Sequence, residues 1–363
     1  MYIHELKQWP NFTWDEQEFH AKLSRIRNRQ GRVLGQMDMM GFVLKEEAML
    51  QTLTLDVVKS SEIEGELLNT DQVRSSVAKH LGIDAGGLTP SNRNVDGVVT
   101  MMLDATQKYD EPLTKGRLYN WHLSLFPGAN SRMQVGKWRN GIKGPMQVVS
   151  GAVGKEKVHF EAPNANIVDS EMTIFLDWLE AKQNIDPVLK AAIAHLWFVT
   201  IHPFDDGNGR ITRAITDMQL ARADNTEQRF YSMSAQIQKE RAGYYHILET
   251  TQKGTLNITE WINWFLTCLD RSMDSTTATL DKINQKNRFW DRNRNIVFNS
   301  RQQKMMEVLL NDFYGKLNVS KWAKIVDCST YTALRDIQDL IAKGILEKEE
   351  GGGRSTSYKL KVV

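Results

Sequence analysis

The sequence has little cysteine, almost no net charge and no long apolar run, and each shortage excludes a class of protein. Its two cysteines, Cys268 and Cys328, fit neither a disulfide framework nor a metal-ligand spacing, so we expect free thiols in a reducing compartment. The formal net charge of +2 gives no overall attraction to nucleic acid or to an anionic membrane. No stretch approaches the roughly 20 apolar residues that a membrane span needs, and residues 1–7 do not resemble a signal peptide. We therefore expect a cytoplasmic protein with no membrane partner.

Helically spaced apolar residues predict a mainly α-helical fold in three regions. The first region, residues 1–95, contains two such series, from Phe19 to Met40 and from Leu44 to Val58. After a glycine-rich link at 86–92, the region 96–272 contains a helix that Asp186-Pro187 can start. That helix is apolar on nearly every side and leads directly to His202, so we expect a buried central helix.

The third region, residues 297–363, has the pattern of a winged helix-turn-helix. Helical spacing covers 304–313, 320–326 and 331–343, and two short strand patterns then flank a glycine-rich turn at 350–354. A second hairpin is predicted in the middle region, over 147–160 with its turn at 150–154. A lone hairpin is marginally stable, so its presence in a helical protein calls for a reason.

Residues 202–213 read His-Pro-Phe-Asp-Asp-Gly-Asn-Gly-Arg-Ile-Thr-Arg and combine several groups that handle phosphate. Pro203 ends the preceding helix, and Gly207 and Gly209 allow close approach of the backbone. A glycine-rich loop that leads into a helix N-terminus binds anions, because its N–H groups and the helix dipole favour negative charge. Taken separately, each piece is more often an ordinary turn or a solvated helix face.

Charged side chains in the same segment extend this interpretation. Arg210 and Arg213 are three residues apart and can grip phosphate oxygens from one helix face. Asp206 offers a hard oxygen ligand for Mg²⁺. His202, with an ordinary pKa near neutrality, can take a proton from an attacking hydroxyl. Together these residues favour phosphoryl or nucleotidyl transfer, where positioning and charge stabilisation dominate.

The segment resembles the Fic-domain signature His-Pro-Phe-x-(Asp/Glu)-Gly-Asn-Gly-Arg-x-x-Arg, with every specified position filled. The resemblance implies a helical enzyme that transfers AMP from ATP to a Ser, Thr or Tyr hydroxyl of a target protein, or of itself, and releases pyrophosphate. The roles that it implies are His202 as general base, Asp206 as Mg²⁺ ligand, Gly207, Asn208, Gly209 and Arg210 at the α- and β-phosphates, and Arg213 at the γ-phosphate.

Three further segments extend the resemblance. Residues 135–139 are similar to the family's Gly-x-Trp-Arg segment. The hairpin resembles the flap that docks a target peptide by strand addition, which implies docking by Val148, Val149, Val158 and His159. Tyr244, Tyr245 and Trp261 match aromatic positions that wall the nucleotide pocket, with plain core packing as an equal alternative.

The segment 60–65 resembles the family's inhibitory motif, (Ser/Thr)-x-x-x-Glu-(Gly/Asn), with Ser60 and Glu64 in the specified positions. The resemblance implies that Glu64 pairs with Arg213, removes the partner of the γ-phosphate and leaves ATP only an unproductive pose. The resemblance also allows a second role for Glu64, found in some members of the family, in which it positions water to remove AMP from modified targets. The domains expected are an N-terminal region 1–95 that carries this motif, a catalytic domain 96–272 and a winged helix 297–363.

For the winged helix the sequence favours protein contact or dimerisation over DNA binding, with a packing appendage as a third alternative. The reading helix would be 331–343, with Arg335, Gln338 and Lys343 exposed. However, Asp336 and Asp339 dilute its positive charge, whereas phosphate contact needs a basic surface. A homodimer is expected because it is the commonest assembly of soluble proteins. The alternatives are a DNA-binding regulator whose core senses nucleotide and a scaffold with degenerate chemistry, although the intact motif disfavours the scaffold.

Overall fold

The protein is mainly helical, as the sequence predicts. Its structure, a computed structural model, describes residues 1–38, 42–83, 89–128, 133–142, 144–151, 157–310, 313, 315–349 and 356–361. Parts of the expected link and turns, at 86–88, 152–154 and 350–354, lie outside these residues. No helix within the described ranges is long and apolar enough to cross a membrane. Both cysteines are free, as expected, and Cys268 is buried.

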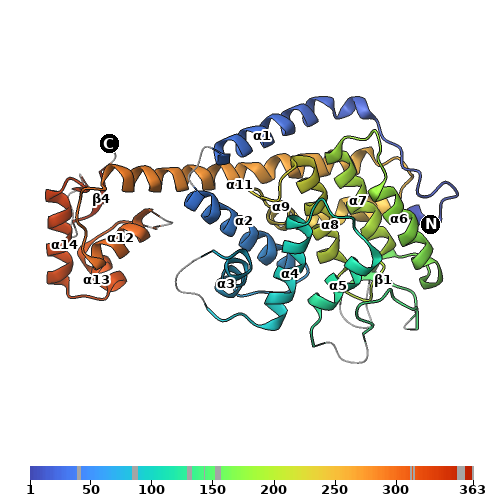
Figure 1. Cartoon of the computed structure of the whole chain (residues 1–363), viewed down its shortest axis with the longest axis horizontal. Helices are drawn as coiled ribbons and strands as arrows, with labels where there is room; N and C mark the ends of the chain where they lie inside the picture. Colours follow the sequence, from blue (N-terminus) through green and yellow to red (C-terminus); the bar gives the residue numbers. More distant parts are fainter. Residues whose placement is uncertain are drawn as a thin grey trace. The chain divides into compact units, whose positions relative to one another are not determined.

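The chain divides into two compact units, residues 1–277 and 278–363, and each is described by itself. The first unit consists of helices with one hairpin (Figure 1). Its helices are α1 (His20–Asp38), α2 (Phe42–Ile63), α3 (Thr70–Leu81), α4 (Arg93–Gln107), α5 (Lys115–Leu125), α6 (Val168–Glu180), α7 (Pro187–Ile201), α8 (Asn208–Asp224), α9 (Met233–Lys239) and α10 (Arg241–Gln252), followed by α11 (Thr259–Arg292), which begins here and continues past the boundary. The strands are β1 (Gln147–Ser150) and β2 (Lys157–Glu161), and single turns of 3-10 helix cover Ile3–Glu5, Glu16–Glu18 and Ala165–Ile167.

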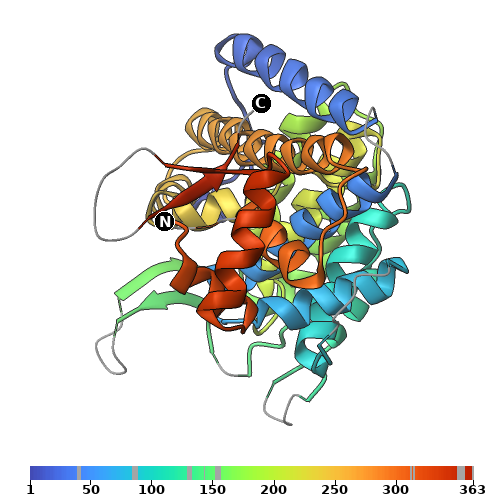
Figure 2. The same cartoon turned by 90° about the vertical axis from the view of Figure 1, so that its left-hand side faces the viewer.

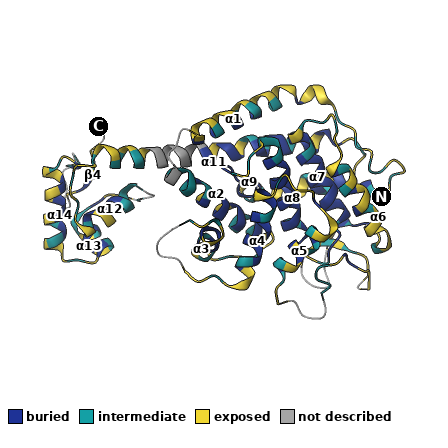
Figure 3. Cartoon of the chain, in the orientation of Figure 1, coloured by how far each residue is buried: buried dark blue, intermediate teal, exposed yellow. Residues whose placement is uncertain are grey.

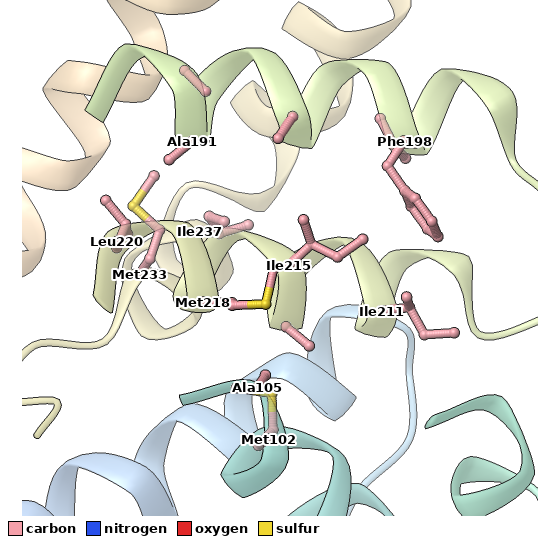
Figure 4. Packing of buried hydrophobic residues seen from close by; sticks show 14 of the residues in the cluster. Met102, Ala105, Ala191, Phe198, Ile211, Ile215, Met218, Leu220, Met233 and Ile237 are labelled. Atoms are coloured by element: carbon pink, nitrogen blue, oxygen red, sulfur yellow. The ribbon is translucent and has the colours of Figure 1, made fainter. Parts of the chain in front are cut away.

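Helix α7 is the buried central helix that the sequence predicts. The side chain of Asp186 caps its first turn by accepting from the Val188 N–H, and Pro187 occupies a position where no N–H is needed. All other residues of α7 except Lys190 are buried, and Figure 3 shows both α7 and α8 as mostly buried ribbons. Apolar side chains of the two helices face each other, and α4 packs against α8 on the opposite side (Figure 4).

The N-terminal apolar series form α1 and α2, with Met40 outside the described residues. Helix α2 packs against α3 and α9 and also contacts α8. Because α2 continues to Ile63, it carries Ser60 into the interior, where that residue is fully buried. The end of α2 is thereby placed beside the start of α8, although the two are distant in sequence.

The second unit contains the predicted helix-turn-helix. Its helices are α12 (Ser300–Leu310), α13 (Val319–Val326) and α14 (Thr330–Ala342), and its antiparallel strands are β3 (Leu346–Lys348) and β4 (Tyr358–Leu360). Asn318 caps α13 and Ser329 caps α14, each through a side-chain oxygen. Trp322, Ile337 and Leu340 are fully buried and form the centre of its core.

Candidate active site

Helix α7 ends in a turn that holds the histidine of the motif. His202 takes left-handed backbone angles (φ 51°, ψ 58°), and its imidazole Nδ1 lies 3.2 Å from the carbonyl oxygen of Val199. Because a carbonyl only accepts hydrogen bonds, Nδ1 carries the proton and Nε2 keeps its lone pair. Burial lowers the pKa of His202, which favours the neutral ring. The geometry therefore leaves Nε2 able to accept a proton.

The loop that follows is closed by the side chain of Asn208. Its Oδ1 accepts from the Phe204 N–H at 2.9 Å, and its Nδ2 donates to the Phe204 carbonyl at 2.8 Å. Helix α8 then begins after Gly207, which has a φ of 76° and provides no side-chain cap. The first N–H groups of α8 are thus suited to binding an anion. Asp206 lies beside them, and its Oδ1 accepts from the Gly207 N–H at 2.6 Å.

Two buried side chains outside the motif brace this loop. Arg139 donates from Nε to the His202 carbonyl at 2.8 Å, and its NH2 group donates to the carbonyls of Ile201 and Pro163. In the sequence Arg139 stands out only as part of a family segment, and no role follows from that resemblance. These bonds fix the main chain at the C-terminal end of α7, so Arg139 positions His202.

The second brace is His122 of α5, which the sequence analysis does not identify. Its Nδ1 accepts from the Gly136 N–H at 2.9 Å, so its Nε2 carries the proton and donates to the Asp206 carbonyl at 3.2 Å. The ring stacks on Phe204 with centroids 4.2 Å apart. Burial lowers the pKa of His122 to about 4, which keeps the ring neutral as these bonds require. A single histidine in a helix carries no signal of this role in the sequence.

The two arginines of the motif are both held by the segment that ends α2. Arg213 is buried, and it donates from Nε to Ser60 Oγ at 2.9 Å and from NH2 to the Ser60 carbonyl at 2.7 Å. Its NH1 lies 2.9 Å from Glu64 Oε1 in an ion pair. Arg210 NH1 lies 2.5 Å from Glu66 Oε2, a residue that the sequence analysis does not identify. Both cations therefore have anionic partners.

A turn with a left-handed glycine presents Glu64 to Arg213. Gly65 has a φ of 84°, and the Glu66 N–H donates back to the Ser61 carbonyl at 3.0 Å. On the other side, a Cβ at Gly209 would meet Glu64 Oε1, so the glycine leaves room for this carboxylate beside Arg213. The contact between Glu64 and Arg213 thus lies between two glycines, Gly65 and Gly209.

Helix α10 supplies an aromatic wall. Tyr244 is buried, and its hydroxyl lies 2.9 Å from Nε2 of His195. Tyr245 is more exposed and packs on Tyr244 with ring centroids 5.2 Å apart. Trp261 is fully buried and donates to the Ala192 carbonyl at 2.8 Å. Trp261 therefore belongs to the core behind these tyrosines and does not line the cavity described below.

The predicted hairpin stands at the edge of the first unit (Figure 2). Val148 pairs with Phe160 and Val149 with Val158, with an irregularity of register between the two pairs. Val149 is 47% exposed and Val158 38% exposed, which leaves both side chains open to a partner.

A cavity of about 790 Å³ lies between the loop, α10 and the hairpin. The predicted site residues that line it are Glu64, Val148, Val149, His159, His202, Asp206, Gly207, Asn208, Gly209, Tyr244 and Tyr245. Ser60 and Arg213 are buried behind Glu64, and Arg210 is buried beside Glu66. The structure thus brings the predicted base, anion loop and inhibitory glutamate to one cavity.

The cavity suits Mg²⁺ that arrives with a nucleotide. Asp206 lines the cavity beside the start of α8, with Asp205 adjacent. Within the described residues no three His, Cys, Asp or Glu side chains form a cluster that could hold a metal ion by themselves. Mg²⁺ commonly takes one or two carboxylates, water and substrate phosphates, and this donor set fits such binding.

Comparison with known proteins finds similarity in three parts of the chain. Residues 112–220 match the Fic/DOC family, residues 2–83 match a domain of unknown function (DUF4172), and residues 301–359 match the DeoR-like helix-turn-helix domain. Residues 112–220 are therefore similar to the Fic/DOC family, and residues 301–359 are similar to a DeoR-like helix-turn-helix domain.

The matching relatives are distant. The chain is 34% identical over 105 residues to Protein adenylyltransferase Fic of Drosophila willistoni, over 28% of this chain and 20% of the relative. It is 27% identical over 240 residues to the protein of that name from Culex quinquefasciatus, over 63% of this chain and 42% of the relative. It thus spans less than half the length of these curated relatives. A crystal structure of a Fic family protein from Desulfovibrio desulfuricans G20 shares the fold with a TM-score of 0.55 and 19% identity, over 94% of this chain and 95% of the other.

Proposed function

We propose that the chain is a protein adenylyltransferase that transfers AMP from ATP to a protein hydroxyl. The proposal rests on one arrangement: Nε2 of His202 keeps its lone pair in the same cavity as the start of α8. In this reaction the hydroxyl oxygen bonds to the α-phosphorus, the bond from that phosphorus to pyrophosphate breaks, and the hydroxyl proton passes to Nε2 of His202. The N–H groups at the start of α8 hold the phosphates.

Mg²⁺, when bound, would neutralise phosphate charge. In this proposal Asp206 holds the ion, and Arg210 and Arg213 supply positive charge after they are released from their carboxylate partners. The target peptide adds along the hairpin, where exposed Val149 and Val158 offer apolar contact. The curated relatives are named as protein adenylyltransferases, which supports the same reaction for this chain.

The resting state is proposed to be inhibited by Glu64. Its carboxylate pairs with Arg213, and Ser60 takes that guanidinium's other donors. A γ-phosphate in this place would lose its cation and meet a negative charge. Removing Glu64 therefore exposes the arginine and should raise activity.

Intact-mass spectrometry of the Glu64→Gly chain after incubation with ATP and Mg²⁺ tests the reaction type. We expect a gain of AMP that falls when His202→Ala is added, because the hydroxyls that rely on His202 as their base are then no longer modified. A gain of bare phosphate would replace adenylylation with phosphoryl transfer. Equal AMP gain in the unmodified chain would remove the inhibitory role of Glu64.

A second function, DNA binding by the helix-turn-helix unit, is favoured by one observation. Asp336 does not dilute the surface charge of α14 as the sequence analysis assumes, because it is buried and bonded to Arg301 Nε at 2.7 Å. The exposed face of α14 includes Tyr331, Arg335 and Gln338, and Asp339 is the one of the two aspartates that remains on it. A gel shift across rising salt tests this function, since a specific site should still be bound where nonspecific binding has faded.

A further inference from the structure

Three hydroxyl side chains line the cavity among the residues that the structure describes: Ser150, Tyr244 and Tyr245. The Tyr245 hydroxyl donates to a backbone carbonyl, that of Ile63, at 3.4 Å. The Tyr244 hydroxyl faces His195, whose pKa burial lowers to about 3, so this imidazole is a weak base. Ser150 differs from both, because it is exposed and faces a histidine at the cavity surface.

Ser150 belongs to a chain of three groups that links the hairpin to α10. Its Oγ lies 2.6 Å from Nε2 of His159, and Nδ1 of the same ring lies 2.7 Å from Oε2 of Glu249. Lys253, together with His159, lowers the pKa of Glu249 to about 2, so this carboxylate is ionised and accepts the Nδ1 proton. Nε2 is then the acceptor for the Ser150 hydroxyl. A hydroxyl, a base and a group that orients the base form the arrangement that activates nucleophiles.

All three groups line the cavity that holds His202 and the start of α8. The site described above has no use for the Ser150 hydroxyl, and a tie between hairpin and helix would need only the pair of His159 and Glu249. The Ser150 hydroxyl is therefore not needed for the contact between His159 and Glu249, and it lies in the cavity where a nucleotide is proposed to bind.

We infer that Ser150 is an acceptor hydroxyl for adenylylation of the chain by itself, with His159 as its base and Glu249 as the positioning residue. The inference rests on the proposed function and names one substrate group for it. Ser150 Oγ bonds to the α-phosphorus of ATP and the bond from that phosphorus to the β-phosphate oxygen breaks. Pyrophosphate leaves with the electron pair, and the hydroxyl proton passes to Nε2 of His159.

Peptide mapping by mass spectrometry of the Glu64→Gly chain, incubated with ATP and Mg²⁺, tests the inference. We expect AMP on Ser150 and its loss from that peptide in Ser150→Ala. The matched control is Ser170→Ala, since Ser170 is also exposed but donates to the Ile167 carbonyl at 2.8 Å and does not line the cavity. This control should keep the label on Ser150.

The role of the base is tested by rate. His159→Asn should lower the initial rate of Ser150 labelling by about a hundredfold, the contribution of a general base. Glu249→Gln should lower that rate and change its pH profile, whereas loss of a merely structural tie would lower it equally at every pH. An unchanged rate in His159→Asn, or a parallel pH profile in Glu249→Gln, would overturn the role given to each residue.

The remaining outcomes separate the inference from the proposed function. AMP on other residues, dependent on His202, with Ser150 unmodified would overturn the inference and leave the adenylyltransferase standing. No AMP on any peptide of the Glu64→Gly chain would overturn both.

Discussion

The loop between α7 and α8 and the β1–β2 hairpin are two walls of one cavity, held by different means. The loop is fixed by buried groups: Asn208 bonds Phe204 in both directions, and Arg139 and His122 bond its carbonyls. The hairpin is fixed to α10 by half-buried side chains, His159 and Glu249. Since a lost bond costs more where water cannot replace it, substitutions should be far more costly behind the loop than at the hairpin.

The largest effect is expected from Arg139→Met. Several carbonyls would lose a buried donor, which costs on the order of 3 kcal/mol in unfolding free energy. Displacement of His202 would also lower kcat by roughly a hundredfold in the Glu64→Gly background. Denaturant unfolding and the initial rate of AMP incorporation measure the two quantities.

Arg117→Met is the matched control for that comparison. Arg117 also donates to main-chain carbonyls, those of Asp104, Lys108 and Glu111, but does not line the cavity. The Arg117→Met variant should be less stable than the parent, while its kcat stays near that of the parent. Equal loss of kcat in both variants would show that Arg139 acts only on overall stability.

A smaller and pH-dependent effect is expected from His122→Gln. The folded chain keeps His122 neutral down to about pH 4, whereas the unfolded chain takes up a proton near 6.5. Stability should therefore fall as the pH is lowered between these values, by on the order of 3 kcal/mol from this residue. The variant should show a flatter dependence in chemical unfolding across this range, and the exposed His20→Gln should not. If the unfolding free energy depended on pH equally in the parent and in His122→Gln, the proposed role of His122 in holding the loop would be wrong.

The smallest effect is expected from Glu249→Gln at the hairpin. Its ion pair with His159 is partly exposed, and such pairs contribute at most about 1 kcal/mol. Thermal unfolding should therefore be nearly unchanged. A loss of unfolding free energy as large as that of Arg139→Met would show that the loop and the hairpin are held equally strongly.

The mainly helical fold, the central helix, the hairpin and the helix-turn-helix were all predictable from the sequence, because each depends on local spacing and capping. Asp186-Pro187 and the apolar face of α7 are examples. The boundaries of the three expected domains, and the roles of the site residues, remain predictions.

The supports of the site could not be predicted, because they depend on packing between distant segments. His122 and Asp206 are 84 positions apart, and Glu66 and Arg210 are 144 apart. The sequence left pocket wall and core packing as equal alternatives for Trp261, and the structure shows it in the core. Asp336 looked like exposed negative charge, but its partner Arg301 lies 35 positions away.

The central claim is that Glu64 and the γ-phosphate of ATP compete for Arg213. Calorimetric titration of ATP and ADP into three chains tests it most directly: the unmodified chain, Glu64→Gly, and Glu64→Gly combined with Arg213→Ala. We expect similar affinities for ATP and ADP in the unmodified chain, and a preference for ATP of roughly tenfold or more in Glu64→Gly, the contribution of a charged hydrogen bond. That preference should vanish in the double variant. The same ratio of ATP to ADP affinity in all three chains would contradict the account.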